Sequence, residues 1–333
     1  MAPPHPLVDQ PGMPALRERV EKRLAAAVES DDPAMTEMAS HLVRAGGKRL
    51  RPVLAALASA AGTGPATVAD DVITGGVACE LVHVGSLHHD DVIDEAATRH
   101  RVDSVNARWG NVAAILSGDF LLARASELAA SLGTEVAALL AATIGRLCEG
   151  QVRELQLAYR VDRTLADYEA SIEGKTAALF ATSCRIGGLV AEAPRPQVDA
   201  LTEFGRAYGL AFQVVDDILD VVATDEELGK PAGHDMAEGV YTLPVLHTLG
   251  QETPQAAELR SLLGGPLGPG EQTRALALVR EGDGVGAAVT RARAHVDEAM
   301  AALAALPPSP AGDTLAAAAL HLVEGLDGGP VPG

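Results

Sequence analysis

The feature that most limits how this chain can fold is a pair of acidic clusters set in apolar surroundings. The sequence reads DDVID at residues 90–94 and DDILD at residues 216–220. On an α-helix, the first and last aspartates of such a cluster lie on one face, one turn apart. Around the second cluster, apolar and small residues follow a three-four spacing across residues 198–222, which predicts a largely buried helix. Ionised carboxylates in that setting need partners.

A divalent cation is the partner that suits these carboxylates. A single DDxxD cluster is most often an exposed acidic helix face, but a second copy in a similar apolar setting favours a metal site. Oxygen ligands without a soft ligand nearby suit hard ions, and Mg²⁺ is usually held by a few carboxylates together with substrate phosphates. We therefore expect a phosphate or diphosphate substrate, and metal ligands at Asp90, Asp94, Asp216 and Asp220.

The composition predicts an all-α protein. Hydrophobic residues make up 47% of the 333 residues and aromatic residues only 3%, so the core is built mainly of Ala, Leu and Val. Helix-forming residues dominate and β-branched alternation is scarce. We expect one continuous helix over residues 164–190. Many helices with short links indicate a bundle, in which the two acidic helices face each other across a central cavity. We expect a disordered leader at residues 1–14, one domain at residues 15–324 and a frayed tail at residues 325–333.

The charge and the cysteines narrow the class of protein further. The net charge of −19 argues against nucleic acid as a partner, because binding to a phosphate backbone requires a basic surface. The longest uncharged stretch, residues 52–69, contains Gly62, Gly64 and Pro65 and is a poor membrane span. Three widely spaced cysteines are typical of buried thiols in a reducing compartment. We therefore expect a cytoplasmic protein with no membrane span.

A basic cluster, GGKRLRP at residues 46–52, places three cations within four residues where a helix is expected to begin. On its own, such a cluster is as often a solubilising basic turn. Backbone N–H groups at a helix N-terminus, together with lysine and arginine, also make a good anion site. Beside two acidic clusters the phosphate interpretation gains weight. Residues 99–101, Arg-His-Arg, follow the first acidic cluster and are placed to meet the same phosphates.

Taken together, these motifs resemble those of the trans-isoprenyl diphosphate synthases, the polyprenyl synthetase family. The resemblance covers residues 46–246 and implies an isoprenoid synthase helix bundle around a central cavity, usually as a homodimer. It rests on segments in the family's order: GGKRLRP at 46–52, LHHDDVID at 87–94, GD at 118–119, GKT at 174–176, FQVVDDILD at 212–220, GKPAGHD at 229–235 and TLPV at 242–245.

The resemblance also implies roles for matching residues. The isopentenyl diphosphate site is matched by Lys48, Arg51 and His83, with His100 and Arg101 beside them. The allylic diphosphate site is matched by Arg99, Lys175, Thr176, Gln213 and Lys230. The implied catalytic residues are Asp90, Asp91, Asp94, Asp216, Asp217, Asp220 and Lys175. The implied cofactor is Mg²⁺, three ions per active site.

The implied reaction is a Mg²⁺-dependent head-to-tail condensation that makes a trans-polyprenyl diphosphate. An allylic diphosphate ionises only when the charge on the departing pyrophosphate is neutralised, which Mg²⁺ and fixed Lys or Arg groups achieve. The double bond of isopentenyl diphosphate then attacks the allylic cation, and proton loss gives a chain longer by one isoprene unit. Apolar walls protect the cation because they exclude water.

Two positions depart from the family's pattern. The family usually has Arg-Arg-Gly where this chain has Arg99, His100 and Arg101, so one cationic contact to isopentenyl diphosphate is replaced by a histidine. A histidine is mostly neutral at pH 7 unless the phosphate raises its pKa, and Arg101 is placed to substitute. Many members also carry a lysine where this chain has Val240. We expect activity with weaker diphosphate binding.

Small residues before the first acidic cluster bear on product length. Gly85 and Ser86 lie about one helical turn before Asp90. In this family, bulky aromatic residues there stop chain growth early, so small ones imply a deeper cavity and a medium or long product. The alternative is a geranylgeranyl diphosphate synthase, with Phe120 or Leu121 forming the cavity floor.

Three other classes share parts of the pattern. A class I terpene cyclase uses DDxxD, but pairs it with an Asn/Ser/Glu metal triad, whereas the second cluster here is another DDxxD. A non-catalytic subunit of a heteromeric prenyl synthase is expected to lose some acids, and all six are present. A di-iron helix bundle needs two Glu-x-x-His elements, and only residues 80–83 were identified as one.

Overall fold

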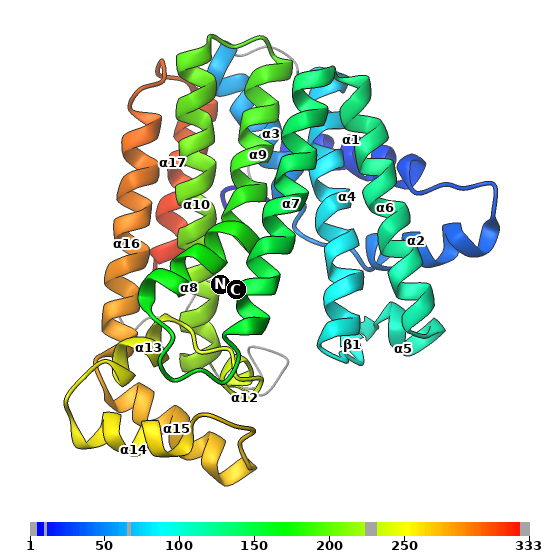
Figure 1. Cartoon of the computed structure of the whole chain (residues 1–333). Coiled ribbons are helices and arrows are strands. Elements are labelled where there is room, and N and C mark those ends of the chain that lie inside the picture. The colour runs from blue at the N-terminus through cyan, green and yellow to red at the C-terminus, as the bar shows by residue number, and fades with distance from the viewer. Residues whose placement is uncertain (1–4, 10–11, 65–67, 224–231, 327–333) are drawn as a thin grey trace.

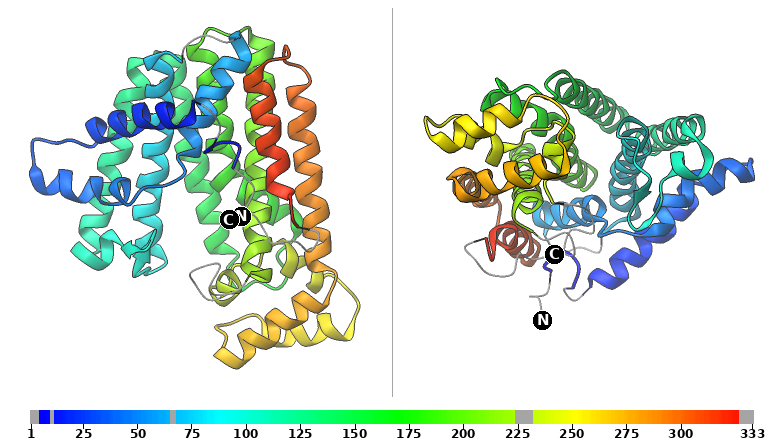
Figure 2. Two further views of the ribbon diagram at one scale, coloured as in Figure 1. Left: turned by 180° about the vertical axis from the view of Figure 1, so that it is seen from behind. Right: turned by 90° about the horizontal axis from the view of Figure 1, so that it is seen from below.

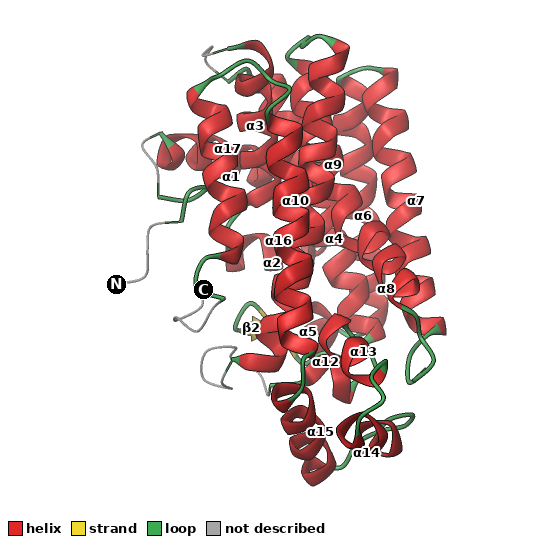
Figure 3. Ribbon diagram, turned by 90° about the vertical axis from the view of Figure 1, so that its left-hand side faces the viewer, coloured by secondary structure: helices red, strands yellow, loops and turns green. Residues whose placement is uncertain are grey.

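A computed structural model of the chain describes residues 5–9, 12–64, 68–223 and 232–326, which are almost entirely helical (Figures 1 and 3). The prediction of an all-α fold is confirmed. The elements are α1 (Met13–Ala27), α2 (Pro33–Ala45), α3 (Leu50–Thr63), α4 (Asp70–Ile93), β1 (Thr98–Arg99), β2 (Val102–Asp103), α5 (Val105–Trp109), α6 (Asn111–Ser131), α7 (Thr134–Gln156), α8 (Leu165–Ile172), the π-helical turn η1 (Glu173–Ala177), α9 (Ala178–Val190), α10 (Arg195–Val222), α12 (His234–Ala237), α13 (Leu243–Leu249), α14 (Pro254–Leu262), α15 (Pro269–Glu281), α16 (Gly284–Leu303) and α17 (Pro310–Val323).

Local sequence signals set where several helices begin. The side chain of Asp32 accepts a hydrogen bond from the backbone N–H of Ala34, and Pro33 occupies the first helical position of α2. A capping box between Thr164 and Asp167 starts α8. These caps satisfy backbone donors that have no partner inside the helix.

The long helices pack side by side, and α9 joins the two that carry the acidic clusters. Helix α4 packs on α3, α6 and α9, whereas α10 packs on α9, α16 and η1. Seen from below, α4, α6 and α7 lie on one side of the bundle and α16 and α17 on the other (Figure 2). Both α4 and α10 run downward in Figure 1, so their C-terminal ends reach the same end of the molecule.

Few aromatic residues are available, and the structure places most of them at the centre of the core. The side chains of Tyr168, Phe180, Phe204, Tyr208 and Tyr241 are at most 1% exposed. Most of the remaining buried side chains are Ala, Leu and Val, as the composition predicted. Small residues let neighbouring helices approach closely.

The structure corrects two local predictions. One continuous helix was expected over residues 164–190, but the π-helical turn η1 separates α8 from α9. A disordered leader was expected up to residue 14, but residues 5–9 form a turn in which Leu7 is fully buried, and α1 begins at Met13. Burying an apolar side chain such as leucine stabilises its position by about 2 kcal/mol. The expected tail lies outside the described residues beyond residue 326.

Within the described part of the chain, no helix is both long enough and apolar enough to cross a membrane.

Candidate active site

The first acidic cluster ends α4, and its middle aspartate is held by the protein. Asp91 is fully buried, and its Oδ1 accepts a hydrogen bond from Nε of Arg99 at 2.8 Å and forms an ion pair with Nη2 of Arg99 at 2.6 Å. Arg99 lies on β1, so this contact ties the β1–β2 hairpin to α4. Asp90 is half-buried, while Asp94 is exposed at the C-cap, where its N–H donates to the Asp90 carbonyl.

The second cluster repeats this arrangement near the end of α10. Asp217 is 2% exposed, and it accepts hydrogen bonds from the hydroxyl of Tyr168 at 2.5 Å and from Nε2 of Gln213 at 2.9 Å. Asp220 is also buried and accepts a hydrogen bond from the backbone N–H of Asp235 at 3.2 Å. Asp216 is exposed.

The six carboxylates therefore differ in role, which the apolar periodicity did not predict. Asp91 and Asp217 are buried and are contacted by charged or polar side chains, although Oδ2 of Asp91 has no hydrogen-bond partner among the described residues. Asp90 is half-buried, and Asp94 and Asp216 are exposed. A middle aspartate held by the protein fixes the rotation of its helix, and so fixes the direction in which its neighbours point.

A cation from η1 lies beside the first cluster. Nζ of Lys175 contacts Glu154 of α7 at 2.5 Å. Burial raises the pKa of Asp90 to about 6; the nearby Asp94 adds to this rise, whereas Lys175 and Arg99 oppose it. The first cluster thus has negative charge in excess of what its surroundings stabilise. A divalent cation beside it would relieve that excess.

The donor chemistry fits Mg²⁺ with few protein ligands. The side chains at the two clusters offer hard carboxylate oxygens. Across residues 5–326, in the part that the structure describes, no three His, Cys, Asp or Glu side chains converge closely enough to hold an ion by themselves. A cation here would take one or two carboxylates and complete its shell with phosphate oxygens and water, the mode that Mg²⁺ prefers.

A separate group of cations surrounds His83 on α4. Burial lowers the pKa of His83 well below its usual value, and Arg51, His100, Arg99 and Arg49 lower it further. The guanidinium of Arg51 lies over the Phe180 ring, 4.7 Å from its centroid. Its Nε has no hydrogen-bond partner among the described residues. Buried positive charge of this kind favours an anion.

Arg49, the middle cation of the basic cluster, has a structural role instead. Its side chain is buried and pairs with Glu21 at 2.8 Å and Glu80 at 3.3 Å, and it donates to the Val43 carbonyl at 2.6 Å. Lys48 is exposed. The basic cluster predicted as one anion site therefore divides into a buried ion pair at Arg49 and two cations, Lys48 and Arg51, that remain available to a ligand.

His100 and Arg101, which depart from the family's pattern, form the turn after the first cluster. His100 and Arg101 form a two-residue loop between the paired residues Arg99 and Val102, with φ angles of 51° and 65°. Two positive φ angles define a type I′ hairpin turn, which favours glycine. Arg101 therefore occupies a strained position. Partial burial, then Arg99 and Arg49, lower the pKa of His100, so this imidazole is neutral at pH 7.

Comparison with known proteins agrees with this geometry. A family model described as polyprenyl synthetase matches residues 32–278. The chain belongs to the polyprenyl synthetase family. A nonaprenyl diphosphate synthase of Mycobacterium tuberculosis is 39% identical over 300 residues, which are 90% of this chain and 89% of that protein. Heptaprenyl diphosphate synthase component 2 of Geobacillus stearothermophilus is 39% identical, over 91% of this chain and 93% of its own.

A solved structure of the polyprenyl synthetase fold matches over nearly the whole chain. The crystal structure of a geranylgeranyl pyrophosphate synthase from Corynebacterium glutamicum, complexed with calcium and isoprenyl diphosphate, superposes with a TM-score of 0.83. It is 39% identical, and the match covers 95% of this chain and 98% of that one. The predictions of the family and of a prenyltransferase are confirmed.

The remaining predicted residues of this polyprenyl synthetase do not all lie in one place. Thr176 on η1 donates to Oε1 of Gln213 at 2.7 Å, so these two lie together. Ser86 is half-buried, with its hydroxyl bonded to the His83 carbonyl. Gly85 faces α6, because a Cβ there would lie 3.1 Å from the Gly118 carbonyl oxygen. That Gly85 lines the product cavity stays a prediction. Lys230 lies outside the described residues.

Sequence reasoning missed three residues beside the predicted ones: Glu154, Arg163 and Tyr168. Glu154 lies in none of the motif segments that carry the family resemblance. In the sequence it is only one of several charged residues on the amphipathic helix α7. Arg163 is 6% exposed and donates to the Tyr241 carbonyl at 3.2 Å. Tyr168 had a usable signal, since it is one of only four tyrosines in the chain and a buried hydroxyl needs a partner.

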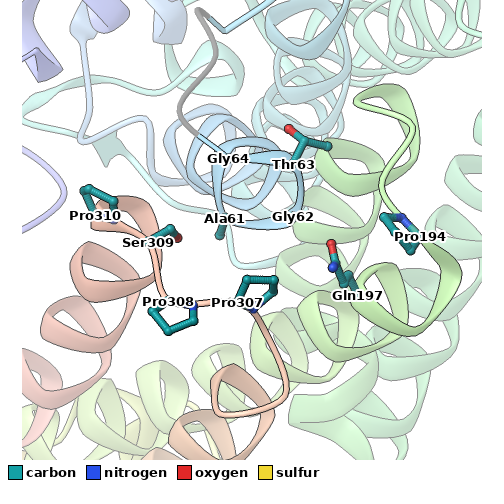
Figure 4. Close-up of a pocket in the computed structure, with 10 residues that line it drawn as sticks. All are labelled: Ala61, Gly62, Thr63, Gly64, Pro194, Gln197, Pro307, Pro308, Ser309 and Pro310. Carbon is teal, nitrogen blue, oxygen red and sulfur yellow. The ribbon is translucent and has the colours of Figure 1, made fainter.

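A cavity of about 660 Å³ lies at the opposite end of the bundle, between the end of α3, the start of α10 and the α16–α17 link (Figure 4). None of its lining side chains is charged, so it offers nothing to hold a diphosphate. The lining residues are Ala61, Gly62, Thr63, Gly64, Pro194, Gln197, Pro307, Pro308, Ser309 and Pro310.

Proposed function

We propose that this chain condenses isopentenyl diphosphate with an allylic diphosphate in the presence of Mg²⁺, and that the product is a medium or long trans-polyprenyl diphosphate. One observation carries the proposal. The acidic clusters with Lys175 and the cationic group around His83 are two chemically distinct groups of side chains, which supports a reaction that binds two diphosphates. A terpene cyclase has one diphosphate to bind and needs only the first of these groups.

The chain's own residues would divide the work between the two substrates. Arg99, Lys175, Thr176 and Gln213 would bind and orient the allylic diphosphate. When bound, Mg²⁺ ions, three in this proposal, neutralise charge on the departing pyrophosphate. Lys48, Arg51 and His83 would hold isopentenyl diphosphate, with His83 as a neutral hydrogen-bonding group. The apolar helix faces between the sites would exclude water from the allylic cation.

We propose a homodimer as the working assembly. Helix α6 exposes three large apolar side chains: Val112 is 71% exposed, Ile115 44% and Leu116 52%. Large apolar side chains gathered on one exposed helix mark an interaction surface. A second candidate assembly is heteromeric, because one relative is named as component 2 of its synthase.

The predicted cytoplasmic location, argued from the cysteines, stays a prediction.

Elongation assays with labelled isopentenyl diphosphate test the proposed reaction. The purified chain is incubated with Mg²⁺ and each of several allylic primers, and product length is measured by chromatography. We expect products longer than twenty carbons, and a loss of at least about 100-fold in kcat for Asp90→Asn, because each acid would stabilise charge in the transition state. Chelation of Mg²⁺ should abolish elongation.

The other outcomes separate the alternatives. A product that stops at twenty carbons would identify a geranylgeranyl diphosphate synthase. A cyclic hydrocarbon made without isopentenyl diphosphate would favour the terpene cyclase. Elongation only after a second, different chain is added would favour the heteromeric synthase. No elongation with any primer, alone or with added chains, would overturn the proposal.

A further inference from the structure

A chain of hydrogen bonds connects η1 to the second acidic cluster and continues to a buried tyrosine. The hydroxyl of Thr176 donates to Oε1 of Gln213 at 2.7 Å. Nε2 of the same Gln213 donates to Oδ1 of Asp217 at 2.9 Å. The hydroxyl of Tyr168 donates to Oδ2 of Asp217 at 2.5 Å. Three elements, η1, α10 and α8, thus meet through four side chains.

Asp217 is the point on which this network converges. Each of its two oxygens accepts a hydrogen bond from a different element, and the residue is 2% exposed. It therefore has little surface to offer a ligand. Its neighbours Asp216 and Asp220 lie one and three positions away on the same helix, so the anchoring of Asp217 fixes the direction of both.

Tyr168 is itself held in place. Its side chain is 1% exposed, and the Arg163 guanidinium lies 5.7 Å from its ring centroid. Arg163 is in turn fixed by its hydrogen bond to the Tyr241 carbonyl. A donor held this firmly loses little entropy when it forms a hydrogen bond, so it can define the position of its acceptor.

We propose that Tyr168 is a positioning residue for the allylic diphosphate site: its hydroxyl, acting through Asp217, sets the orientation of the second acidic cluster. This inference rests on the proposed function, because it assumes that the second cluster grips the allylic diphosphate through Mg²⁺. The first cluster has a parallel device in the contact of Arg99 with Asp91. The difference is that Tyr168 is buried and touches no predicted substrate position.

The variant Tyr168→Phe removes the hydroxyl and keeps the ring. We expect the KM for the allylic diphosphate to rise about tenfold, because a buried hydrogen bond that orients the second cluster is lost, while the KM for isopentenyl diphosphate stays unchanged. A readout independent of turnover is the binding of inorganic pyrophosphate in the presence of Mg²⁺, measured by calorimetry, which should weaken by a similar factor.

The matched control is Tyr208→Phe. Tyr208 lies on α10 and is equally buried, but no hydrogen bond of its hydroxyl is found within the described residues. This variant should leave both KM values and pyrophosphate binding unchanged. A double-mutant cycle with Asp217→Asn adds a direct test of the route: if Tyr168 acts through Asp217, the effects of Tyr168→Phe and Asp217→Asn on pyrophosphate binding are not additive.

The outcomes are distinguishable. If the wild-type chain elongates no primer, the proposed function fails and the positioning role fails with it. If the wild-type chain is active but Tyr168→Phe behaves like Tyr208→Phe, only the positioning role is overturned. A drop in melting temperature with equal changes in both KM values would also overturn it. Should Tyr168→Phe not fold, Asp217→Asn alone changes the acceptor of the Tyr168 hydroxyl, and unchanged pyrophosphate binding in that variant would overturn the proposal.

Discussion

At the scale of single residues, neighbouring side chains of the same type do different work. Asp90 and Asp91 are adjacent, yet the first is half-buried near Lys175 and the second is buried against Arg99. Likewise, the guanidinium of Arg51 lies over an aromatic ring, whereas that of Arg49 forms ion pairs with two glutamates. The partners that decide these roles come from elements distant in the sequence.

His100 offers a test at this scale. Burial and two nearby arginines lower its pKa, so the histidine adds no charge at pH 7. The variant His100→Arg would place a permanent cation in the same turn, and we expect the KM for isopentenyl diphosphate to fall about threefold to tenfold. Steady-state kinetics with varied isopentenyl diphosphate would measure it, and the KM for the allylic primer is the internal control. An unchanged or higher KM for isopentenyl diphosphate would mean that residue 100 does not face that site.

At the scale of elements, the π-helical turn η1 positions Lys175 and Thr176. Single π turns inside α-helices are frequent at functional sites. Here the turn lies against α7 through two glycines, Gly150 and Gly174. A Cβ on Gly150 would lie 2.6 Å from the Lys175 backbone nitrogen, and one on Gly174 would lie 2.9 Å from the Arg146 carbonyl oxygen. The sequence indicated a continuous helix over residues 164–190, because the residues around Gly150 and Gly174 do not show that another backbone packs against either glycine.

Replacing Gly150 tests this contact. We expect Gly150→Ala to lower the free energy of unfolding by about 1–3 kcal/mol, because the added methyl group must push η1 away from α7. The matched control is Gly145→Ala on the same helix, where a Cβ would meet nothing within 4 Å; it should raise stability by up to about 1 kcal/mol. Urea denaturation measures both. Equal stabilities of the two variants would show that the close packing of η1 on α7 does not matter.

At the scale of the whole molecule, much of the architecture follows from the sequence. The apolar spacing around residues 198–222 predicted a buried helix, and α10 is one. The order of the short motifs from residue 46 to residue 246 predicted the family, because unrelated chains do not share such a series. The sequence did not predict the burial of Leu7 or the position of Gly85 against α6, since both depend on long-range packing that local periodicity does not encode.

Product length is a property of the whole bundle, because it depends on how far a growing chain can extend between the helices. Ser86 lies on α4 one turn before Asp90 and is half-buried, whereas Gly85 is enclosed by α6. Of the two small residues, Ser86 has more room for a larger side chain, because a Cβ at Gly85 would already lie 3.1 Å from the Gly118 carbonyl oxygen. We expect Ser86→Phe to shorten the product by several isoprene units, because an aromatic ring fills space that the chain would occupy.

The control for that prediction is Ser86→Ala. It removes the hydrogen bond from the Ser86 hydroxyl to the His83 carbonyl but adds no bulk, so product length should not change. Chromatography of the dephosphorylated products compares the two variants with the wild type. Two results would contradict the prediction. If Ser86→Phe makes products of wild-type length, Ser86 does not line the cavity; if Ser86→Ala shortens them as well, the hydrogen bond to His83 governs length through the isopentenyl diphosphate site.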